Sequence, residues 1–350
     1  MSLLADAEAG TRDARPAGLP TELPVGVLFG QQVDELEPLV DHARLCAEEG
    51  SRLWMGQSMT VETHLALAAV AGRGIRVDTG LAVAVAPLTT PALAWAQARS
   101  IAALMGRSIS ACYGIGSLAA AQAIRGEPMP SPARWMRDFV GSVGALREDA
   151  LRHPGTEGLP EIELGCGVLR PTMARRAAEV SEVVVTWLTP TEHLAATLVP
   201  ALDRGAAAAA RPRPRVVAIV PCAVRRPGRD PVRLAATALG QHIRLPHYAQ
   251  MLRGAGVDLR GERAHDLRAT LRSGLFAWGE PEQIRATLLA HVAAGADEVV
   301  LHLGSVGLVH GHRAALADLR EILAALDDVR HGGAARPTAA SAGPTTLHHP

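Results

Sequence analysis

The stretch from Ile75 to Ser117 constrains the fold more than any other part of the chain. It opens with Ile75–Ala86, a run rich in alanine and β-branched residues that predicts a strand buried on both faces. Pro91–Met105 then carries apolar side chains at helical spacing, and a second apolar run, Ser108–Tyr113, follows it. A strand, a crossover helix and a parallel strand in this order predict an α/β protein.

The same alternation of strand and helix continues along the chain. The expected strands are Leu23–Phe29, Arg52–Gly56, Ile75–Ala86, Ser108–Tyr113, Glu161–Gly167, Val183–Leu188, Val216–Val224 and Glu298–Leu303. The expected helices between and after them are Val33–Glu49, Val61–Ala71, Pro91–Met105, Ser117–Gly126, Pro132–Leu151, Pro171–Val180, Thr191–Ala210, Glu280–Ala294 and His312–Leu326. Eight strands alternating with helices predict a single (β/α)8 TIM barrel, a fold that commonly needs ~250 residues.

We expect the barrel domain to span residues 21–330 of the 350-residue chain. Residues 1–20 are small and polar and predict a flexible leader, and the low-complexity residues 331–350 predict a disordered tail. Residues 230–275, after the seventh strand, are longer than one crossover requires. We therefore expect this extended segment, with its histidines and arginines, to fold over the mouth of the barrel.

Charge and residue usage exclude several classes of function. The chain has 35 basic and 35 acidic residues, so no net field favours nucleic acid or an anionic membrane, and a small-molecule partner is expected. All the basic residues that count toward this balance are arginine, because the sequence contains no lysine. Chemistry that needs an ε-amine, such as a Schiff base or a Walker-type phosphate site, is therefore excluded.

The cysteines and histidines predict neither a disulfide scaffold nor a metal site. The four cysteines, Cys46, Cys112, Cys166 and Cys222, show no C-x-x-C pairing, which favours a reducing cytoplasm. His302, His310 and His312 have no carboxylate at ligand spacing, so we predict no metal. The first residues lack the pattern of a secretory signal, and no run reaches the ~18 apolar residues of a membrane helix.

A family resemblance adds to this interpretation. Thr79-Gly80, Pro91, Gly106-Arg107 and Gly114-Ile115-Gly116 occur in an order and spacing that resembles the bacterial luciferase-like superfamily of flavin- and deazaflavin-dependent oxidoreductases. The resemblance extends from about Leu23 to Leu326. It implies an enzyme, in the form of a homodimer, with the cofactor ring across the carboxyl-terminal mouth of the barrel and against the end of the third strand.

By this resemblance, the third and fourth strands supply part of the cofactor site. Ala82 and Val83 lie in a side-chain-poor platform for the ring, where relatives often have a non-proline cis peptide bond. Gly114, Gly116 and Ser117 correspond to the loop after the fourth strand, although Gly-x-Gly by itself is also a common turn. Ser117 stands where relatives that act on sugar phosphates have a glutamate, which argues against that activity.

The resemblance also implies a phosphate site on the later loops. Gly167 and Arg170 belong to the loop after the fifth strand, where many relatives have a Gly-Gly-Pro nest and this chain has Leu169-Arg170-Pro171. Arg170 is either a guanidinium that replaces backbone contacts to phosphate or an exposed residue at a helix start. Thr186 and Thr189 match positions where relatives present hydroxyl groups or a lysine to the phosphate.

The proton donor is left open. Some relatives have an aspartate–histidine pair after the second strand that transfers a proton. This chain has Gln57-Ser58-Met59 there, so the pair is missing. Hydride transfer to a double bond still requires a proton, because the resulting anion must be neutralised. The catalytic candidates are Ser58, Cys112, Tyr113 and His64, with Glu62 or water as further possibilities.

The function expected from the sequence is two-electron hydride transfer from reduced coenzyme F420 to a C=C or C=N bond of a natural-product-type substrate. A dehydroamino acid in a modified peptide is one such substrate. Arg253, Arg268 and Arg272 could then form a cationic exit for the acidic tail of F420. The alternatives are an FMN-dependent two-component monooxygenase and a non-catalytic barrel that binds flavin or a partner.

Overall fold

The computed structural model describes residues 22–153 and 158–331. The predicted leader, residues 1–20, lies outside the described residues, as does all of the predicted tail beyond His331.

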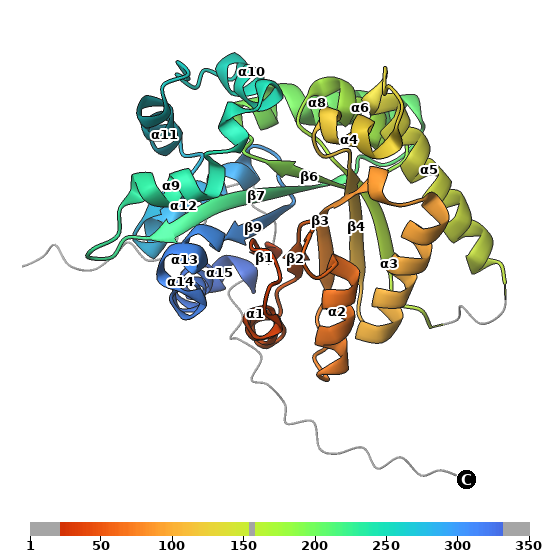
Figure 1. Ribbon diagram of the computed structural model, residues 1–350, viewed down its shortest axis with the longest axis horizontal. Helices are drawn as coiled ribbons and strands as arrows, with labels where there is room; N and C mark the ends of the chain where they lie inside the picture. The colour runs from red at the N-terminus through yellow and green to blue at the C-terminus, as the bar shows by residue number, and fades with distance from the viewer. Residues whose placement is uncertain (1–21, 154–157, 332–350) are drawn as a thin grey trace, which may run out of the picture.

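Eight parallel strands close into a barrel, which confirms the predicted fold (Figure 1). In ring order they are β1 (Val25–Phe29), β2 (Leu53–Met55), β3 (Thr79–Val85), β4 (Ile109–Gly114), β5 (Ile162–Gly167), β6 (Val183–Trp187), β7 (Arg215–Val224) and β9 (Glu298–His302). β9 pairs with both β7 and β1, and β6 pairs with β7, so the ring has no free edge.

Helices surround the barrel and bury its outer face. They are α1 (Leu36–Glu49), α2 (Thr63–Gly72), α3 (Pro91–Met105), α4 (Leu118–Arg125), α5 (Pro132–Leu151), α6 (Pro171–Ala178), α7 (Thr191–His193), α8 (Val199–Ala208), α12 (Pro281–Ala293), α13 (Gly304–His310), α14 (His312–Ala324) and α15 (Asp327–Arg330). Local signals set their ends: for α3, the Thr90 hydroxyl accepts a hydrogen bond from Leu93 N, and Gly106 ends the helix in the left-handed conformation.

The segment after β7 contains α9 (Pro231–Leu239), a 3-10 turn (His242–Arg244), α10 (Pro246–Gly254) and α11 (Arg263–Arg272). α10 and α11 stand above the ends of the strands in Figure 1. A short strand, β8 (Ala277–Gly279), follows and pairs with Cys222–Val224 outside the ring. β8 and α13 were not predicted, because three residues carry no periodicity and α13 contains two glycines.

Trp54 fills the base of the barrel interior. A Cβ on Gly26 would lie 2.6 Å from the Trp54 ring, and a Cβ on Gly80 would also collide with it. The two glycines therefore make room for the indole, which packs with the inward-facing side chains of the other strands. These side chains are Leu28, Cys112, Val183, Val185, Val217, Ile219 and Val300.

An ionic network accompanies Trp54 at the base. The Arg215 guanidinium donates to Glu163 Oε2 at 2.6 Å and also pairs with Glu298, whose other oxygen accepts from Trp54 Nε1 at 2.7 Å. Glu298 is only 2% exposed. Buried carboxylates need such partners, so this cluster closes the amino-terminal end of the barrel.

Candidate active site

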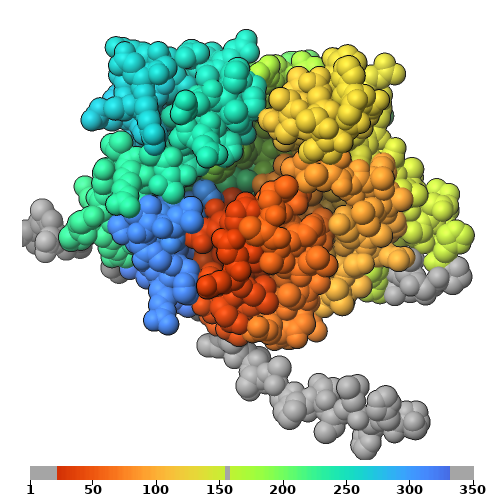
Figure 2. All heavy atoms as spheres, viewed as in Figure 1, coloured from red at the N-terminus to blue at the C-terminus, as the bar shows by residue number. Residues whose placement is uncertain are grey.

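One side of the barrel mouth is lined by glycine. Strand alternation turns Gly30, Gly56, Gly114 and Gly167 inward at the carboxyl ends of β1, β2, β4 and β5. Neighbouring side chains occupy the space beside three of them, His302 at Gly30 and Val83 at Gly114 and Gly167, whereas the space beside Gly56 is open enough for a ligand to approach the backbone. Figure 2 shows a recess on this face, between the teal atoms of the segment after β7 and the yellow and orange atoms that follow β3 and β4.

Val83 packs against this glycine side. The peptide bond between Ala82 and Val83 is cis, as the family resemblance implied, and the pairing of β3 with β4 shifts register between Ala82 and Ala84. A Cβ on Gly167 would lie 3.0 Å from Val83 Cγ1. Ala82 and Val83 thus present a small apolar surface that packs on the barrel interior.

The loop after β4 turns immediately into a helix. Gly116 has φ +66°, a left-handed conformation that favours glycine, and a Cβ there would lie 3.7 Å from Val85. The Ser117 hydroxyl caps α4 by accepting a hydrogen bond from Ala120 N at 3.1 Å. Ser117 therefore has a structural role as a helix cap. Its contact with a cofactor stays a prediction.

Arg170 lies at the start of α6 and is exposed. Its positive charge contributes to lowering the pKa of His247, after the larger effect of burial, so the loop after β5 faces α10 across the mouth. His193 lies on the same rim, where its Nε2 is 3.2 Å from Leu169 O. Arg170 therefore places a positive charge on this rim, beside the amino terminus of α6.

The two threonines of β6 and its loop are buried. Thr186 is 2% exposed and alternates with the inward-facing Val185 and Trp187, which places it on the helix side of β6. Thr189 is 4% exposed, and its hydroxyl donates to Trp187 O at 3.4 Å. Both threonine side chains are therefore buried, whereas the Arg170 side chain is exposed to solvent.

Between Gly167 and Gly30 in the ring of strands, the mouth is lined by rings, which the sequence interpretation did not assign to the site. Trp187 ends β6, His302 ends β9, and their ring centroids are 5.1 Å apart at an interplanar angle of 88°. His242 lies 5.6 Å from Trp187, and Tyr248 lies 5.5 Å from His242. Inward alternation along β6 and β9 was the signal that would have found Trp187 and His302.

Burial makes this ring wall electrically neutral. Burial lowers the pKa of His302 to about 4, although a hydrogen bond to the backbone of Gly30 opposes the effect. Burial, and then the neighbouring His247, lower the pKa of His242. Burial also raises the pKa of the Tyr248 hydroxyl to about 12. At neutral pH these three side chains therefore carry no charge.

Among the candidate proton donors, Ser58 is engaged in its own loop. Its hydroxyl accepts a hydrogen bond from Val33 N at 3.3 Å, and its backbone N donates to the Thr63 hydroxyl at 2.8 Å. Ser58 is 3% exposed. These contacts fix the loop between β2 and α2.

His64, in contrast, has one ring nitrogen without a hydrogen-bond partner among the described residues. Its Nδ1 lies 2.7 Å from Glu62 Oε1, while its buried Nε2 has no hydrogen-bond partner among the described residues. Burial alone would raise the pKa of Glu62, but hydrogen bonds from His64 and Leu65 lower it. An ionised Glu62 orients the imidazole with Nδ1–H toward the carboxylate, so Nε2 accepts a proton in the neutral ring and donates one when the ring is cationic.

Cys112 and Tyr113 are occupied elsewhere on β4. Cys112 is fully buried in the barrel interior, and burial raises the pKa of its thiol well above the usual value. Tyr113 points to the helix side, where its hydroxyl donates to Ala94 O at 3.2 Å and its ring packs on Phe139. Burial also raises the Tyr113 pKa, so neither group is arranged to release a proton at the mouth.

Metal ligands do not gather in the described part of the chain. Over residues 22–153 and 158–331, no three His, Cys, Asp or Glu side chains come together in a way that could hold a metal ion. No helix within these ranges is long and apolar enough to cross a membrane.

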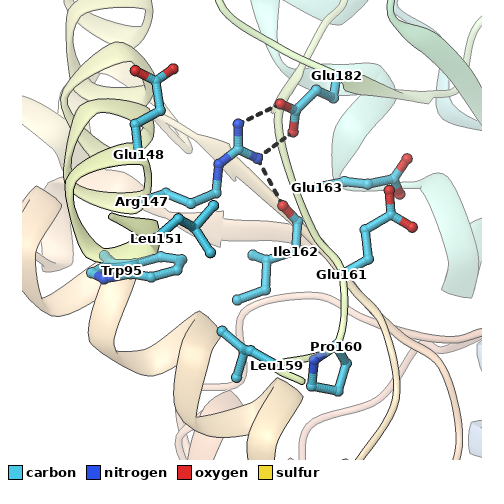
Figure 3. Close-up of a pocket in the computed structure, with 10 residues that line it drawn as sticks. All are labelled: Trp95, Arg147, Glu148, Leu151, Leu159, Pro160, Glu161, Ile162, Glu163 and Glu182. Carbon is cyan, nitrogen blue, oxygen red and sulfur yellow. Dashed lines mark hydrogen bonds and ion pairs between the residues drawn. The ribbon is translucent and has the colours of Figure 1, made fainter. Parts of the chain in front are cut away.

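A second hollow, of about 430 Å³, lies at the opposite end of the barrel, between α3, α5 and the start of β5 (Figure 3). Its lining residues are Trp95, Arg147, Glu148, Leu151, Leu159, Pro160, Glu161, Ile162, Glu163 and Glu182. Arg147 donates to both oxygens of Glu182, at 2.7 and 2.5 Å, and to Ile162 O at 2.8 Å. This arginine is thus engaged in holding α5 against the barrel.

The profile of the luciferase-like monooxygenase family matches residues 18–298. The chain belongs to this family. No curated protein sequence matches the chain significantly.

Solved structures of similar shape include enzymes with two kinds of cofactor. The F420-dependent tetrahydromethanopterin reductase from Methanopyrus kandleri is 16% identical, with a TM-score of 0.61 over 87% of this chain and 99% of that one. The oxygenating component of 3,6-diketocamphane monooxygenase from Pseudomonas putida, in complex with FMN, is 14% identical, with a TM-score of 0.63 over 87% and 98%. EDTA monooxygenase from Chelativorans sp. BNC1 is 14% identical, with a TM-score of 0.64 over 88% and 94%. At these identities the likeness shows that this luciferase-like protein shares their fold.

Proposed function

We propose that this luciferase-like protein is an oxidoreductase that uses reduced coenzyme F420 to transfer a hydride to a C=C or C=N bond. Support comes first from the fit of a planar ring system. The glycine side of the mouth is open at Gly56, while Gly114 and Gly167 leave room for Val83. Ala82 and Val83 form a small apolar surface beside it.

The observation that carries the choice of F420 is the exposed Arg170 on the rim of the mouth. F420 continues beyond its phosphate into lactyl and glutamyl groups, so it needs an open, positively charged exit. Arg170 is exposed and lies at a helix amino terminus, which is a favourable place for an anion. Of the arginines proposed from the sequence, Arg253 donates to Leu259 O and so is partly engaged.

When bound, reduced F420 supplies the hydride, and the residues of this chain supply position and a proton. Val83 and the inward-facing glycines hold a planar ring, while the segment over the mouth limits the access of water. His64 Nε2, oriented through Glu62, is the proton donor that the geometry supports best among the candidates. The substrate is a small molecule or a modified peptide.

An FMN-dependent monooxygenase is the second candidate. The family profile is that of luciferase-like monooxygenases, and two of the structural neighbours described above are monooxygenases. FMN ends at its phosphate and would pair with Arg170 without needing an open exit for a longer anionic tail.

Anaerobic calorimetric titration with reduced F420 and reduced FMN tests this proposal. We expect tighter binding of F420, weakened by salt because exposed charge pairs are screened. Arg170→Ala should weaken F420 binding about tenfold or more, since a charge-assisted hydrogen bond is lost. Arg175→Ala, on the exposed side of the same helix, is the matched control. Equal or tighter FMN binding would instead assign the protein to the monooxygenases, and binding of neither cofactor would leave a non-catalytic barrel.

A further inference from the structure

Three ring nitrogens on the ring wall are buried and have no hydrogen-bond partner among the described residues. They are Trp187 Nε1, His242 Nδ1 and His302 Nδ1. They come from three separate parts of the chain: the end of β6, the turn after α9 and the end of β9. A buried polar atom without a partner is costly, so a convergence of three at the mouth indicates a ligand that would satisfy them.

The rings form one continuous wall rather than isolated positions. Trp187 contacts His302 on one side and His242 on the other, with centroid distances of 5.1 and 5.6 Å, both nearly edge to face. Tyr248 extends the wall from His242 at 5.5 Å, and His247 follows at 4.8 Å. One molecule of moderate size can therefore reach several of these rings at once.

The hydrogen-bonding roles of two of the three atoms are fixed. Indole Nε1–H of Trp187 can only donate. His302 hydrogen-bonds to the backbone of Gly30, and since its Nδ1 has no partner, the bond is made by Nε2. The neutral ring thus carries its proton on Nε2, and Nδ1 can only accept. The wall offers a donor and an acceptor on neighbouring rings.

We propose that Trp187, His242 and His302 form the substrate subsite. We further propose that it takes a neutral, planar, conjugated molecule with a carbonyl oxygen next to an N–H or O–H group. This inference rests on the proposed function in placing the cofactor beside Gly56 and Val83, away from Trp187. The carbonyl oxygen accepts from Trp187 Nε1, the adjacent N–H or O–H donates to His302 Nδ1, and the conjugated framework packs on the rings.

The charges around the wall favour a neutral substrate. His302 and His242 carry no positive charge at neutral pH, and the lone pair of His302 Nδ1 repels an anion. Arg170 is the cation beside His247, which lies at the end of the wall away from His302. Glu298 and Glu163, at the base of the barrel, share Arg215, and Arg52 adds a second positive charge near Glu163. A carboxylate bound at Trp187 would therefore have no ion-pairing partner.

Carbostyril (2-quinolone) is a suitable probe, because it is neutral and planar and carries a carbonyl beside an N–H. N-methylcarbostyril lacks only the donor, and quinaldate has a similar ring system with a carboxylate. We expect calorimetry with the full-length protein to show that carbostyril binds about tenfold more tightly than either analogue, the effect of one unsatisfied hydrogen bond. Its affinity should stay constant from pH 8 down to about pH 5.5, because His302 is still neutral there.

Two variants assign the effect to the wall. Trp187→Phe keeps an aromatic ring but removes the donor, and it should weaken carbostyril binding about tenfold; Trp95→Phe, on α3 away from the mouth, should not. In His302→Phe, N-methylation of the probe should no longer matter, since the acceptor is gone. If His302→Phe does not fold, Trp187→Phe and the two analogues still test the donor and the acceptor.

Several results would overturn the inference. These are no carbostyril binding by the wild-type protein, equal affinity in Trp187→Phe and Trp95→Phe, or a preference for quinaldate. Titration of Trp187→Phe with reduced F420 separates this inference from the proposed function. Unchanged F420 affinity is expected, and an equal loss for F420 would assign Trp187 to the cofactor site instead. Carbostyril binding without any cofactor binding would reject the proposed function alone.

Discussion

Val83 occupies the space that a side chain on Gly114 would need: a Cβ there would lie 2.7 Å from Val83 Cγ2. The two residues belong to adjacent strands, β3 and β4, at the point where the strand register shifts. The small apolar surface at the mouth is therefore built by a pair, with glycine on one strand because valine protrudes from the other. Substituting Gly114 would displace Val83, so a different glycine offers a cleaner test of the cofactor site.

Gly56 provides that test. A Cβ on Gly56 would meet only Ala82 O, at 3.7 Å, so Gly56→Val should fold while filling the mouth. We expect affinity for the reduced cofactor to fall at least about tenfold, with the free energy of unfolding changed by less than about 1 kcal/mol. Calorimetry and urea unfolding measure the two quantities. Gly72→Ala, on α2, where a Cβ meets nothing within 4 Å, is the control. Unchanged cofactor affinity in folded Gly56→Val would remove this side of the mouth from the site.

The barrel could be predicted because its strands and helices carry strong local signals. α3 was predicted with its observed ends, since Thr90, Pro91 and Gly106 mark where the helix starts and stops. β3 was predicted as Ile75–Ala86 but is Thr79–Val85. The apolar residues Ile75 and Val77 precede it as irregular buried chain, and apolar character alone does not separate the two.

The candidate site was only half predictable. Its glycine side follows from a family pattern at Gly114 and Gly167, whereas its ring wall joins residues that are far apart in sequence. Nothing local to Trp187 or His242 shows that the two rings touch, because their contact depends on how the segment after β7 folds over the mouth. Tyr113 shows the same limit, since one residue of strand phase decides whether a ring faces the interior or the helices.

His64 is predicted to supply the proton. With reduced F420 as donor and cyclohexenone as a model C=C acceptor, His64→Asn should lower turnover by about 10²–10⁴, the usual range for losing a general acid. Cofactor affinity should not change, because His64 contacts Glu62 rather than the glycine side. His310→Asn, at an exposed position on α13, is the control. A variant that keeps wild-type turnover would return the role to water or another group.

Arg215 is predicted to be the main electrostatic contributor to stability at the base of the barrel. Arg215→Met leaves Glu163 and Glu298 without their cation, and we expect a loss of about 3 kcal/mol in urea unfolding at pH 7. Arg73→Met breaks a pair with Glu37 in which both side chains are about half exposed, and it should cost less than about 0.5 kcal/mol. Similar losses in the two variants would contradict this assignment.

The pH dependence of the Arg215 variant has a defined sign. Burial alone would raise the pKa of Glu163, but the hydrogen bond and charge of Arg215 lower it below its usual value. A lowered folded-state pKa stabilises the protein above the unfolded-state pKa, and this stability is lost as the pH falls through the folded-state value. In Arg215→Met the Glu163 carboxylate is buried without its main cation, so protonating it relieves the penalty. The difference from wild type should shrink as the pH falls from 7 toward 4, and a constant difference would contradict the prediction.

A homodimer is predicted from the exposed apolar side chains of α2 and α3, which pack side by side (Figure 1). Leu65 is 66% exposed, and Leu93 and Leu104 are each 50% exposed. The sequence of α2, THLALAAVAG, is apolar around most of its circumference, which is typical of a helix covered on more than one side. A second copy of the same surface can cover it through two-fold symmetry.

In light scattering coupled to size exclusion, the wild-type protein should therefore be a dimer and Leu65→Arg a monomer, because an unpaired guanidinium would be buried at the contact. Leu308→Arg, on α13 and 62% exposed, introduces the same charge elsewhere and should stay dimeric. A monomeric wild type, or a dimer that survives Leu65→Arg, would show that α2 and α3 do not form the interface.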